Sequence, residues 1–546
     1  MSDLTFQKSI QNHPDRTTGT DEIIIGRGCK LTISDAKKLF HNNPRVNLSV
    51  ESKNEMQRSY DFLKGYIDQR LPIYGINTHF GDQVNLLDPN LAPQNTTEKY
   101  GESINQRQLN LIKSHACGLG SILSPDIVKT AMLLRGHCLS QGFSGATPQV
   151  VTAIINFINH DIVPIVRCYG SIGASGDLIP LAMIAAAMVG EEVDVLYQGK
   201  LMKAPLALKM AGLQKFQPEG RDGLALINGT SLMTAIASLA VYDLHRIFKQ
   251  ALSAIAMALE SMLVIESAYH PLVHQLKQQQ GEILVNDFLL AFWKGSQLLT
   301  DLDELRQSNL THLTQNDSKP ARAVQDFYSL RSVAQGFGPF HENLERATTW
   351  IENEMNSVND NPIVDYVTQK IHHNANFMGY YVTDACDILK MNISQASTWL
   401  HALLANLVHP RKSQHLPANL VEDPGTQNGF RPLQLLAASL AVQNRKLAQV
   451  HQSYMLPTEG DNQDVNSLGT HAALDLKEST ANFERLTAIL LLAACQALEF
   501  RGLEKSSPRA KEIHSVMREH FAPVTSCRPL SDEIENIVSV LQSDII

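Results

Sequence analysis

The stretch Tyr169-Gly-Ser-Ile-Gly-Ala-Ser-Gly-Asp-Leu-Ile-Pro180 is the segment around which the rest of the chain is organised. Its three glycines allow tight turns and an unusually close approach of backbone atoms. The apolar, alanine-rich run from Leu181 to Val189 follows and predicts a buried helix. Asp177 therefore lies near a helix start, where the free amides carry partial positive charge and favour a carboxylate.

The tripeptide Ala174-Ser175-Gly176 at the centre of this stretch has three interpretations. A nucleophilic serine on a strand-to-helix elbow requires Gly-x-Ser-x-Gly, and Asp177 breaks that pattern. An ordinary glycine and serine turn before a helix is the commonest meaning of such a tripeptide. The third interpretation is self-modification. The Gly176 nitrogen, unobstructed by a Cβ, attacks the Ala174 carbonyl, and Ser175 loses water, which leaves a five-membered ring with an electron-poor alkene.

The run Gly170-Ser-Ile-Gly-Ala-Ser-Gly-Asp-Leu-Ile-Pro-Leu181 resembles the signature of the histidine and phenylalanine ammonia-lyase family, and the resemblance extends from about Tyr74 to about Arg501. Members of that family form a 4-methylideneimidazol-5-one group (MIO) from this tripeptide. The resemblance thus implies MIO as the prosthetic group, with no metal and no nucleotide. It also implies a mainly α, fumarase/aspartase-like fold, in which a smaller N-terminal domain bears the catalytic loops beside a central bundle of long helices.

The family's Tyr-Gly-x-x-Thr motif supplies its catalytic base, and Tyr74 matches that tyrosine. A phenol titrates near pH 10, so it acts as a base only if positive charge or hydrogen-bond donors lower its pKa. His79 departs from the pattern, because the family most often carries glycine there. This change puts the flexibility of the loop in doubt or adds a polar group to the mouth of the site.

Further matches to the family imply roles for four more residues. Asn228 is expected to donate a hydrogen bond to the substrate or the ring. Tyr328 and Arg331 match the family's Tyr-Ser-x-Arg, in which the arginine holds the substrate carboxylate. A planar guanidinium suits that task because it meets a carboxylate with two parallel hydrogen bonds. Phe377 is expected to pack near the prosthetic ring or, almost equally, in the ordinary core.

The positions that select the substrate ring in this family disagree with one another. Ser114 and His115 resemble the pair found in histidine lyases. In contrast, Arg431, Glu459 and Gln463 resemble the phenylalanine and tyrosine group, since histidine lyases carry glutamate at the position of Gln463. Histidine, phenylalanine and tyrosine therefore all remain open as substrates.

The implied reaction is the non-oxidative removal of ammonia from an aromatic L-amino acid, which yields an α,β-unsaturated acid. An electrophile that accepts the amine makes the nitrogen a better leaving group, and no ordinary side chain is electrophilic enough. Helix N-termini aimed at the ring would make it more electron-poor. A 2,3-aminomutase, which returns the ammonia to the β-carbon, is the closest alternative, and a helical scaffold without activity is a remote one.

Composition limits the partners and the compartment. The 546 residues carry a formal charge of -9, with 44% apolar residues and no basic run, which speaks against a nucleic-acid surface. The most apolar helical segments are too short to span a membrane. Seven scattered cysteines without a Cys-x-x-Cys pair favour neither a disulfide framework nor a zinc site, and fit a reduced cytoplasmic setting.

The expected organisation has four parts: a flexible arm over 1–20, an N-terminal domain over 21–220, a helical bundle over 221–500 and a helical segment over 501–546. Local patterns predict a strand over 22–26 and helices over 32–40, 46–70, 231–299, 382–407 and 432–454. The family resemblance further implies a homotetramer whose active sites draw loops from three subunits, so that Tyr74 could serve the ring of a neighbouring subunit.

Overall fold

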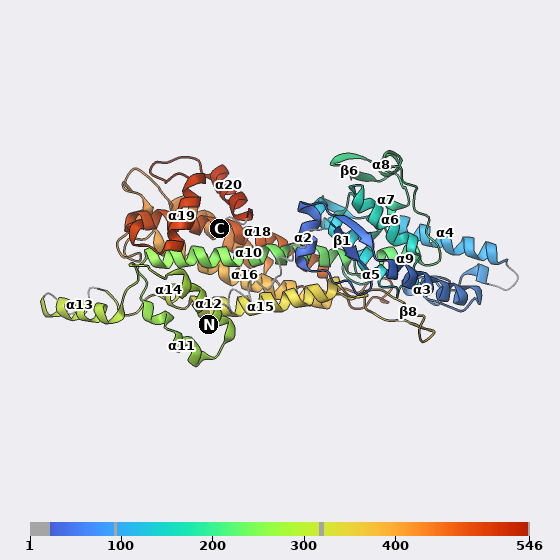
Figure 1. The fold of residues 1–546 in the computed structure, drawn as a ribbon, viewed down its shortest axis with the longest axis horizontal. Helices are drawn as coiled ribbons and strands as arrows, with labels where there is room; N and C mark the ends of the chain where they lie inside the picture. Colours follow the sequence, from blue (N-terminus) through green and yellow to red (C-terminus); the bar gives the residue numbers. More distant parts are fainter. Residues whose placement is uncertain (1–21, 92–95, 316–321, 544–546) are drawn as a thin grey trace.

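The computed structural model describes residues 22–91, 96–315 and 322–543, so the predicted arm over 1–20 lies outside the described residues. The fold is mainly helical, as predicted. Figure 1 shows an elongated molecule in which long helices run from a mixed lobe at one end to a second group of shorter helices at the other.

Five long helices form the central bundle. Two of them, α10 and α18, are buried along most of their length and pack side by side, because both carry apolar or small residues on every face. The others cover this pair. The bundle comprises α10 (Ser231–Ser261), α15 (Val333–Met355), α16 (Tyr380–Leu407), α17 (Arg431–Leu447) and α18 (Gly469–Arg501).

The mixed lobe, drawn mostly in blue and cyan in Figure 1, surrounds the beginning of α10. Its strands form small sheets: β1 pairs with β2 in parallel, β3 with β5 and β4 with β6 in antiparallel fashion, and β6 with β7. The lobe contains β1 (Glu22–Ile25), α2 (Ile33–His41), β2 (Arg45–Leu48), α3 (Val50–Asp68), α4 (Thr97–His115), β3 (Leu119–Ile122), α5 (Pro125–Ser140), α6 (Pro148–Asn159), β4 (Ile162–Pro164), β5 (Arg167–Tyr169), α7 (Leu178–Met188), β6 (Asp194–Tyr197), β7 (Lys200–Lys203), α8 (Ala204–Ala211) and α9 (Asp222–Ile227).

Shorter elements complete the chain. At the opposite end of the bundle lie η3 (Glu266–Tyr269), α11 (Pro271–Lys277), α12 (Gln280–Phe292), α13 (Leu302–Gln315), α14 (Tyr328–Arg331), α19 (Pro508–His520) and α20 (Ser531–Gln542). The hairpin of β8 (Ile363–Asp365) and β9 (Lys370–His372) returns to the lobe, and η5 (His451–Tyr454) follows α17.

Local sequence signals predicted some elements well and others less so. The strand near residue 22 and the helix opened by Thr32 are confirmed, and Thr32 and Asp35 form the reciprocal bonds of a capping box. The helix predicted over 46–70 is wrong at its start, because residues 45–48 pair with β1 and the helix begins only after Ser49. The helix predicted over 231–299 ends at Ser261, and Leu263 adopts a left-handed φ of 56°.

The lobe and the bundle meet at two glycines. Gly176 and Gly229 form a parallel bridge, and the Asp177 amide donates to the Gly229 carbonyl oxygen at 2.7 Å. A Cβ on Gly229 would lie 2.0 Å from Nη1 of Arg135 and 2.6 Å from Oδ1 of Asn359, both buried groups. Only glycine fits at this position, because the neighbouring groups are fixed by the core.

We expect Gly229→Ala to destabilise the protein by about 2 kcal/mol or more, since the added methyl group overpacks a buried polar layer. Gly101→Ala is the matched control, because a Cβ on this glycine of α4 meets nothing within 4 Å. Alanine in a helix should leave stability unchanged or raise it by up to about 1 kcal/mol. Thermal unfolding of both variants measures the difference, and equal melting temperatures would contradict the close packing described.

Candidate active site

The tripeptide Ala174–Gly176 lies in the loop between β5 and α7, where the N-termini of several helices converge. The Leu468 amide donates to the Ile172 carbonyl at 2.9 Å, one residue before α18 begins. The Thr383 hydroxyl of α16 donates to Ser467 O at 2.7 Å, and the Ser467 amide donates to Gly173 O at 3.2 Å. The first turns of α7, α10, α16 and α18 therefore surround the loop with the positive ends of four helix dipoles.

Asp177 joins these helices through one buried carboxylate. Its Oδ2 accepts from the Leu232 and Met233 amides at 2.9 Å each, which caps α10. Its Oδ1 accepts from the hydroxyls of Ser171, at 2.9 Å, and Thr470. Burial raises the pKa of Asp177, while these four hydrogen bonds act in the opposite direction. The sequence placed Asp177 at the start of its own helix, yet its side chain does not cap α7.

The backbone of the tripeptide is held in a conformation that suits glycine. Gly173 and Gly176 have φ values of +71° and +68°. A Cβ on Gly176 would lie 2.1 Å from Gly229 O, and Ala174 is buried. Ser175 is only partly buried, and its hydroxyl accepts from Nε2 of Gln463 at 3.4 Å. The loop thus presents the serine side chain at the surface of a rigid, glycine-lined turn.

The loop that carries Tyr74 is tied to the same region through Gln108 of α4. The Gln108 amide nitrogen donates to Gly75 O at 2.8 Å, and its oxygen accepts from the Leu224 amide of α9 at 2.8 Å. The Tyr74 ring meets Phe80 edge to face, with centroids 6.3 Å apart. Tyr74 and Ser175 are therefore positioned by the same lobe of one chain.

Within one chain, the surroundings of Tyr74 do not favour its ionised form. Burial raises the pKa of Tyr74, the Gly81 amide lowers it, and the Glu459 carboxylate raises it again. The net direction is upward. A base at this position needs a cation or further donors from elsewhere.

Glu459 and Gln463 occupy one turn that lies against both loops. Thr458 and Gln463 form an antiparallel bridge that closes the turn. Oε2 of Glu459 lies where a Cβ on Gly81 would be, 2.0 Å from it. Burial raises the pKa of Glu459, the nearby His115 lowers it, and Asp82 raises it. The turn thus gathers the Tyr74 loop, Ser175 and the end of α4.

His115 and Ser114 close α4 with their side chains turned back on the helix. Nδ1 of His115 lies 2.9 Å from Leu111 O, and a carbonyl only accepts, so Nδ1 carries the proton in this contact. In the neutral ring, Nε2 then keeps its lone pair as an acceptor. The Ser114 hydroxyl, which is exposed, donates to the same carbonyl at 3.1 Å.

Asn228 belongs to a buried network behind the tripeptide. Its Nδ2 donates to Oδ1 of Asp360 at 3.0 Å, and Arg221 donates to both oxygens of that carboxylate at 2.7 and 3.0 Å. Burial raises the pKa of Asp360, but the charge and hydrogen bonds of Arg221 and the Arg135 charge together outweigh burial, and the pKa is lowered. The network fixes the strand-like segment at Gly229, and the donor role of Asn228 toward a substrate stays a prediction.

The sequence missed Asp360, Arg221 and Gln108 as supports of the site. Asp360 lies in the Asn356–Pro362 turn, which the sequence shows to be polar. Nothing in the sequence indicates that Arg221 is the partner of Asp360. Arg221 and Gln108 lack a local pattern that would indicate their role. Phe377, which is partly buried, lies in the loop that leads into α16 at this end of the bundle.

Tyr328, Arg331 and Arg431 lie at the other end of the bundle. Tyr328 is 75% exposed, and the Arg331 guanidinium lies over its ring at 4.5 Å. Ser329 binds this turn to α16, since its carbonyl accepts from Trp399 Nε1 at 2.9 Å and its hydroxyl accepts from Asn406 Nδ2 at 3.0 Å. Arg431 is exposed at the start of α17, directly after Phe430, whose amide donates to Asn419 O in the segment that follows the end of α16.

The long helix α16 separates the two groups of predicted site residues. Thr383 contacts Ser467 beside the tripeptide, whereas Asn406 contacts Ser329 beside Arg331. At the usual helical rise these two residues lie about 35 Å apart along α16. Arg331 and Ser175 of one chain therefore do not meet in one site, and Figure 1 shows α14 and α9 at opposite ends of the molecule.

The sequence profile of the aromatic amino acid lyases ("Aromatic amino acid lyase") matches residues 31–519. The chain belongs to this family. It is 33% identical over 517 residues to a histidine ammonia-lyase of Treponema denticola, covering 95% of this chain and 96% of that protein. It is also 33% identical over 490 residues to a tyrosine 2,3-aminomutase of Chondromyces crocatus, covering 89% and 90%. The solved structure of a Pantoea agglomerans phenylalanine aminomutase superposes with a TM-score of 0.89 at 28% identity, covering 95% and 99%.

Other features of this aromatic amino acid lyase bear on partners. In the described part of the chain, no helix is long and apolar enough to cross a membrane. Among the same residues, no cluster of three or more histidine, cysteine, aspartate or glutamate side chains could hold a metal ion. All seven cysteines are free thiols.

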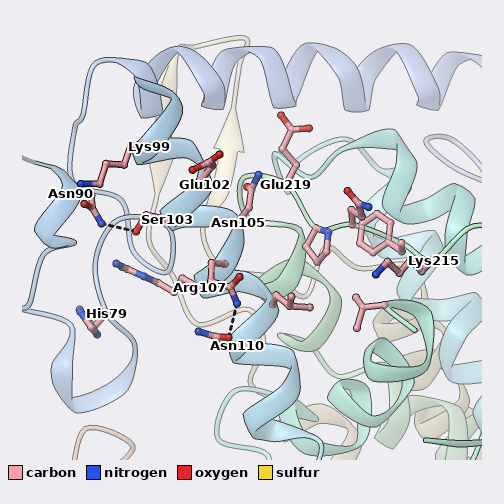
Figure 2. A pocket seen from close by; sticks show the side chains of 16 residues that line it. His79, Asn90, Lys99, Glu102, Ser103, Asn105, Arg107, Asn110, Lys215 and Glu219 are labelled. Carbon is pink, nitrogen blue, oxygen red and sulfur yellow. Dashed lines mark hydrogen bonds between the residues drawn. The ribbon is translucent and has the colours of Figure 1, made fainter. Parts of the chain in front are cut away.

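A separate cleft of about 1060 Å³ opens between α4 and the segment at 215–219 (Figure 2). His79, the residue that departs from the family pattern, lies in its wall, together with Arg107, Asn110 and Glu219. The predicted site residues do not line this cleft. His79 thus adds a polar group to a neighbouring cleft.

We expect Glu459→Gln to move the pH at which turnover rises to lower values, because removal of this negative charge lowers the pKa of Tyr74. The pH profile of kcat/KM measures this shift. Asp461→Asn is the control, because it also removes a negative charge from the same exposed turn. Asp461 is not among the groups that raise the pKa of Tyr74. Equal shifts in both variants would contradict the assignment.

Proposed function

We propose that this chain is an ammonia-lyase that converts an aromatic L-amino acid to the α,β-unsaturated acid and ammonia. The observation that carries the proposal is the packing of Gly176 against Gly229, where no Cβ fits, at the meeting point of four helix N-termini. A rigid turn of this kind brings backbone atoms close and surrounds them with positive dipole ends.

The residues present fit the MIO group that the family forms. Ala174 is buried, Gly176 lacks the Cβ that would obstruct its nitrogen, and the Ser175 side chain is partly open. Maturation would join the Gly176 nitrogen to the Ala174 carbonyl carbon and release two waters, one from that condensation and one from Ser175. The finished group would supply an electrophile that accepts the amine.

The chain's own residues would do the rest of the work. Tyr74 would remove the β-hydrogen, and Arg331 would hold the substrate carboxylate with its planar fork. The first turns of α10 and α18 would stabilise developing negative charge near Ser175. Asn228, held by Asp360, would donate toward the reacting centre with the hydrogen that now bonds Asn361 O, and Tyr328 would lie beside Arg331.

A homotetramer with shared sites would bring together the two groups of predicted site residues that α16 separates within one chain. Arg331 of one copy would meet Ser175 and Tyr74 of another, and its charge would supply the cation that Tyr74 lacks within one chain. Large apolar side chains on the outer face of the bundle support association, since Tyr381 is 63% exposed and Leu435 is 70% exposed. Arg431, at the same end as Arg331, would enter the shared site with it.

We favour histidine as the first substrate to test. The acceptor nitrogen of His115 and the carboxylate of Glu459 suit a ring that carries N–H groups, and Ser114 and Gln463 add polar atoms nearby. A tyrosine ring also offers a hydroxyl donor, so tyrosine ranks second and phenylalanine third. The seven free thiols fit a reduced cytoplasmic setting.

A 2,3-aminomutase is the second candidate function. The Chondromyces crocatus relative is named a tyrosine 2,3-aminomutase, and the Pantoea agglomerans structure is named a phenylalanine aminomutase. The two reactions share the first half, so the same residues serve both. They differ in how long the ammonia and the unsaturated acid are retained, which depends on closure of the loops.

We expect Ser175→Ala to retain the fold and lose all turnover. Wild-type protein should be lighter than its sequence by two water molecules, and the variant should lack that loss. Intact-mass measurement tests the maturation, and ultraviolet absorbance of the unsaturated acid tests turnover with histidine, tyrosine and phenylalanine offered separately. A fully active variant, or wild-type protein without the mass loss, would contradict the proposal. A β-amino acid among the products would favour the aminomutase.

We expect two inactive variants, Tyr74→Phe and Arg331→Gln, to restore activity when they are unfolded and reassembled together. In a random equal mixture, about a quarter of the shared sites would combine a normal Tyr74 from one copy with a normal Arg331 from another. Reassembly of each variant alone is the control. No recovery in the mixture would place both residues in the same chain's site.

A further inference from the structure

The segment between α17 and α18 carries Glu459 and Gln463 over the reactive tripeptide. It runs from residue 448 to residue 468 and contains η5 and the Thr458–Gln463 turn. Its far end is fixed to the tripeptide loop by the bonds from Ser467 and Leu468 described above. The turn therefore keeps its place only if the near end is fixed as well.

The near end is fixed by a partly buried group of charged side chains, which we name the His451 cluster: Asp387, Lys390, His451 and Asp475. The Lys390 side chain is 0% exposed, and its ammonium contacts Asp387 Oδ1 at 2.8 Å and Gln449 O at 2.9 Å. The His451 amide donates to Asp387 Oδ2 at 2.8 Å. Two residues of α16 thus bind the backbone of the segment on either side of residue 450.

The His451 ring lies between carboxylates of two helices. Its Nδ1 lies 3.2 Å from Asp387 Oδ1 on α16, and its Nε2 lies 3.2 Å from Asp475 Oδ2 on α18. Lys390 Nζ also lies 2.7 Å from Nδ1. An ammonium only donates, so the neutral ring accepts from Lys390 at Nδ1 and donates to Asp475 at Nε2. When the ring is charged, Nδ1 donates to Asp387 instead, the ammonium turns to Asp387 and Gln449 O, and the two carboxylates link the helices through the ring.

The surroundings favour the charged ring. Burial and the Lys390 charge lower the pKa of His451, but the hydrogen bonds to Asp387 and Asp475, together with the Asp387 charge, outweigh them, and the pKa is raised above its ordinary 6.5. The charged link is therefore complete below about pH 6 and is lost as pH rises through the raised pKa. The neutral ring keeps a weaker connection between the helices, because it accepts from Lys390 at Nδ1 and donates to Asp475 at Nε2.

Other titratable groups around the ring do not replace this link. His471 of α18 stacks on His451 with ring centroids 6.5 Å apart, and burial and the His451 charge outweigh the Asp475 charge and lower the pKa of His471, which favours its neutral ring. Asp384 of α16 accepts from Gln452, and burial and Asp387 raise its pKa. The Tyr454 ring meets His451 edge to face, and its hydroxyl donates to Gln449 Oε1.

We propose that His451 is a positioning residue whose charged ring links α16 to α18 and holds the Glu459–Gln463 turn against Ser175, so that substrate binding weakens as His451 loses its proton. The proposal rests on the proposed function in one respect, namely that the turn contacts the substrate. The placement of the turn itself is independent of that function.

His451→Gln tests the proposal, because glutamine keeps a donor and an acceptor but never carries a charge. In wild-type enzyme we expect KM to be lowest near pH 6 and to rise toward pH 9. In the variant we expect KM at pH 6 to be raised about five- to tenfold, with kcat and the mass of the matured protein unchanged, and to vary little with pH. Hydrogen exchange of residues 455–465, followed by mass spectrometry at both pH values, should show the same loss of protection.

Two further variants separate charge from structure. Asp475→Asn keeps an acceptor for Nε2 but removes a charge, so the rise in KM should move to lower pH. Glu478→Gln removes a charge from α18 that contacts Gln443 instead, and should behave as wild type. The proposal would be overturned if wild type and His451→Gln showed the same pH dependence of KM and of hydrogen exchange. It would also be overturned if kcat and the melting temperature of that variant fell together with its substrate affinity. If the protein turned over none of the three amino acids but still showed pH-dependent exchange, the proposed function would be wrong and the positioning role of His451 would be supported.

Discussion

The carboxylate of Asp177 is the interaction on which the reactive loop depends. It is fully buried, and its four hydrogen-bond donors come from the start of α10, from α18 and from its own loop. Burying a carboxylate costs free energy unless donors surround it, and removal of one partner leaves the others unpaired. The positive end of the α10 dipole offsets part of the free energy that burying this carboxylate costs. One side chain thus fixes the loop to two helices that are far apart in the sequence.

A second buried charge supports the same loop from behind. The Arg221–Asp360 pair is fully buried and uses two nearly parallel hydrogen bonds, the geometry in which such a pair resists disruption. Asn228 joins this pair, and Gly229 follows it directly. Gly176 therefore packs against a backbone that cannot move without breaking an ion pair in the core. Rigidity at this turn is the condition for any chemistry between neighbouring backbone atoms, because attack requires the reacting atoms to stay in close contact.

The sequence predicted the parts of the fold that local patterns determine. The capping box at Thr32 and the helix after Asp177 follow from short-range signals, and the mainly helical class follows from the family resemblance. Asp177 as the cap of α10 could not be predicted, because its partners Leu232 and Met233 lie more than fifty positions away. The strand at Arg45–Leu48 was missed for a similar reason, since pairing with β1 overrides its local helical pattern.

The predicted site residues fall into two groups at the two ends of the bundle, and the sequence did not indicate this arrangement. Motifs placed Tyr74, Ser175 and Gln463 in one site, and the structure gathers the loops that carry them. The same kind of motif added Arg331, and nothing in the spacing along the chain revealed that the two groups contact α16 at residues about 35 Å apart along the helix. A motif indicates which residues act in the same active site, but it does not indicate whether those residues come from one copy of the chain or from several.

The length of the bundle gives this separation a physical meaning. If two copies associate with their bundles antiparallel, the lobe end of each lies beside the opposite end of the other, and one twofold axis creates two equivalent composite sites. The offset between the copies is then set by the rise of α16, because the same helix anchors Ser467 at one end and Ser329 at the other. An insertion in α16 would displace Arg331 from the neighbouring copy's tripeptide by about 1.5 Å per residue. In the proposed assembly the helix therefore acts as a spacer, and its length is as much a determinant of the active site as the residues that line it.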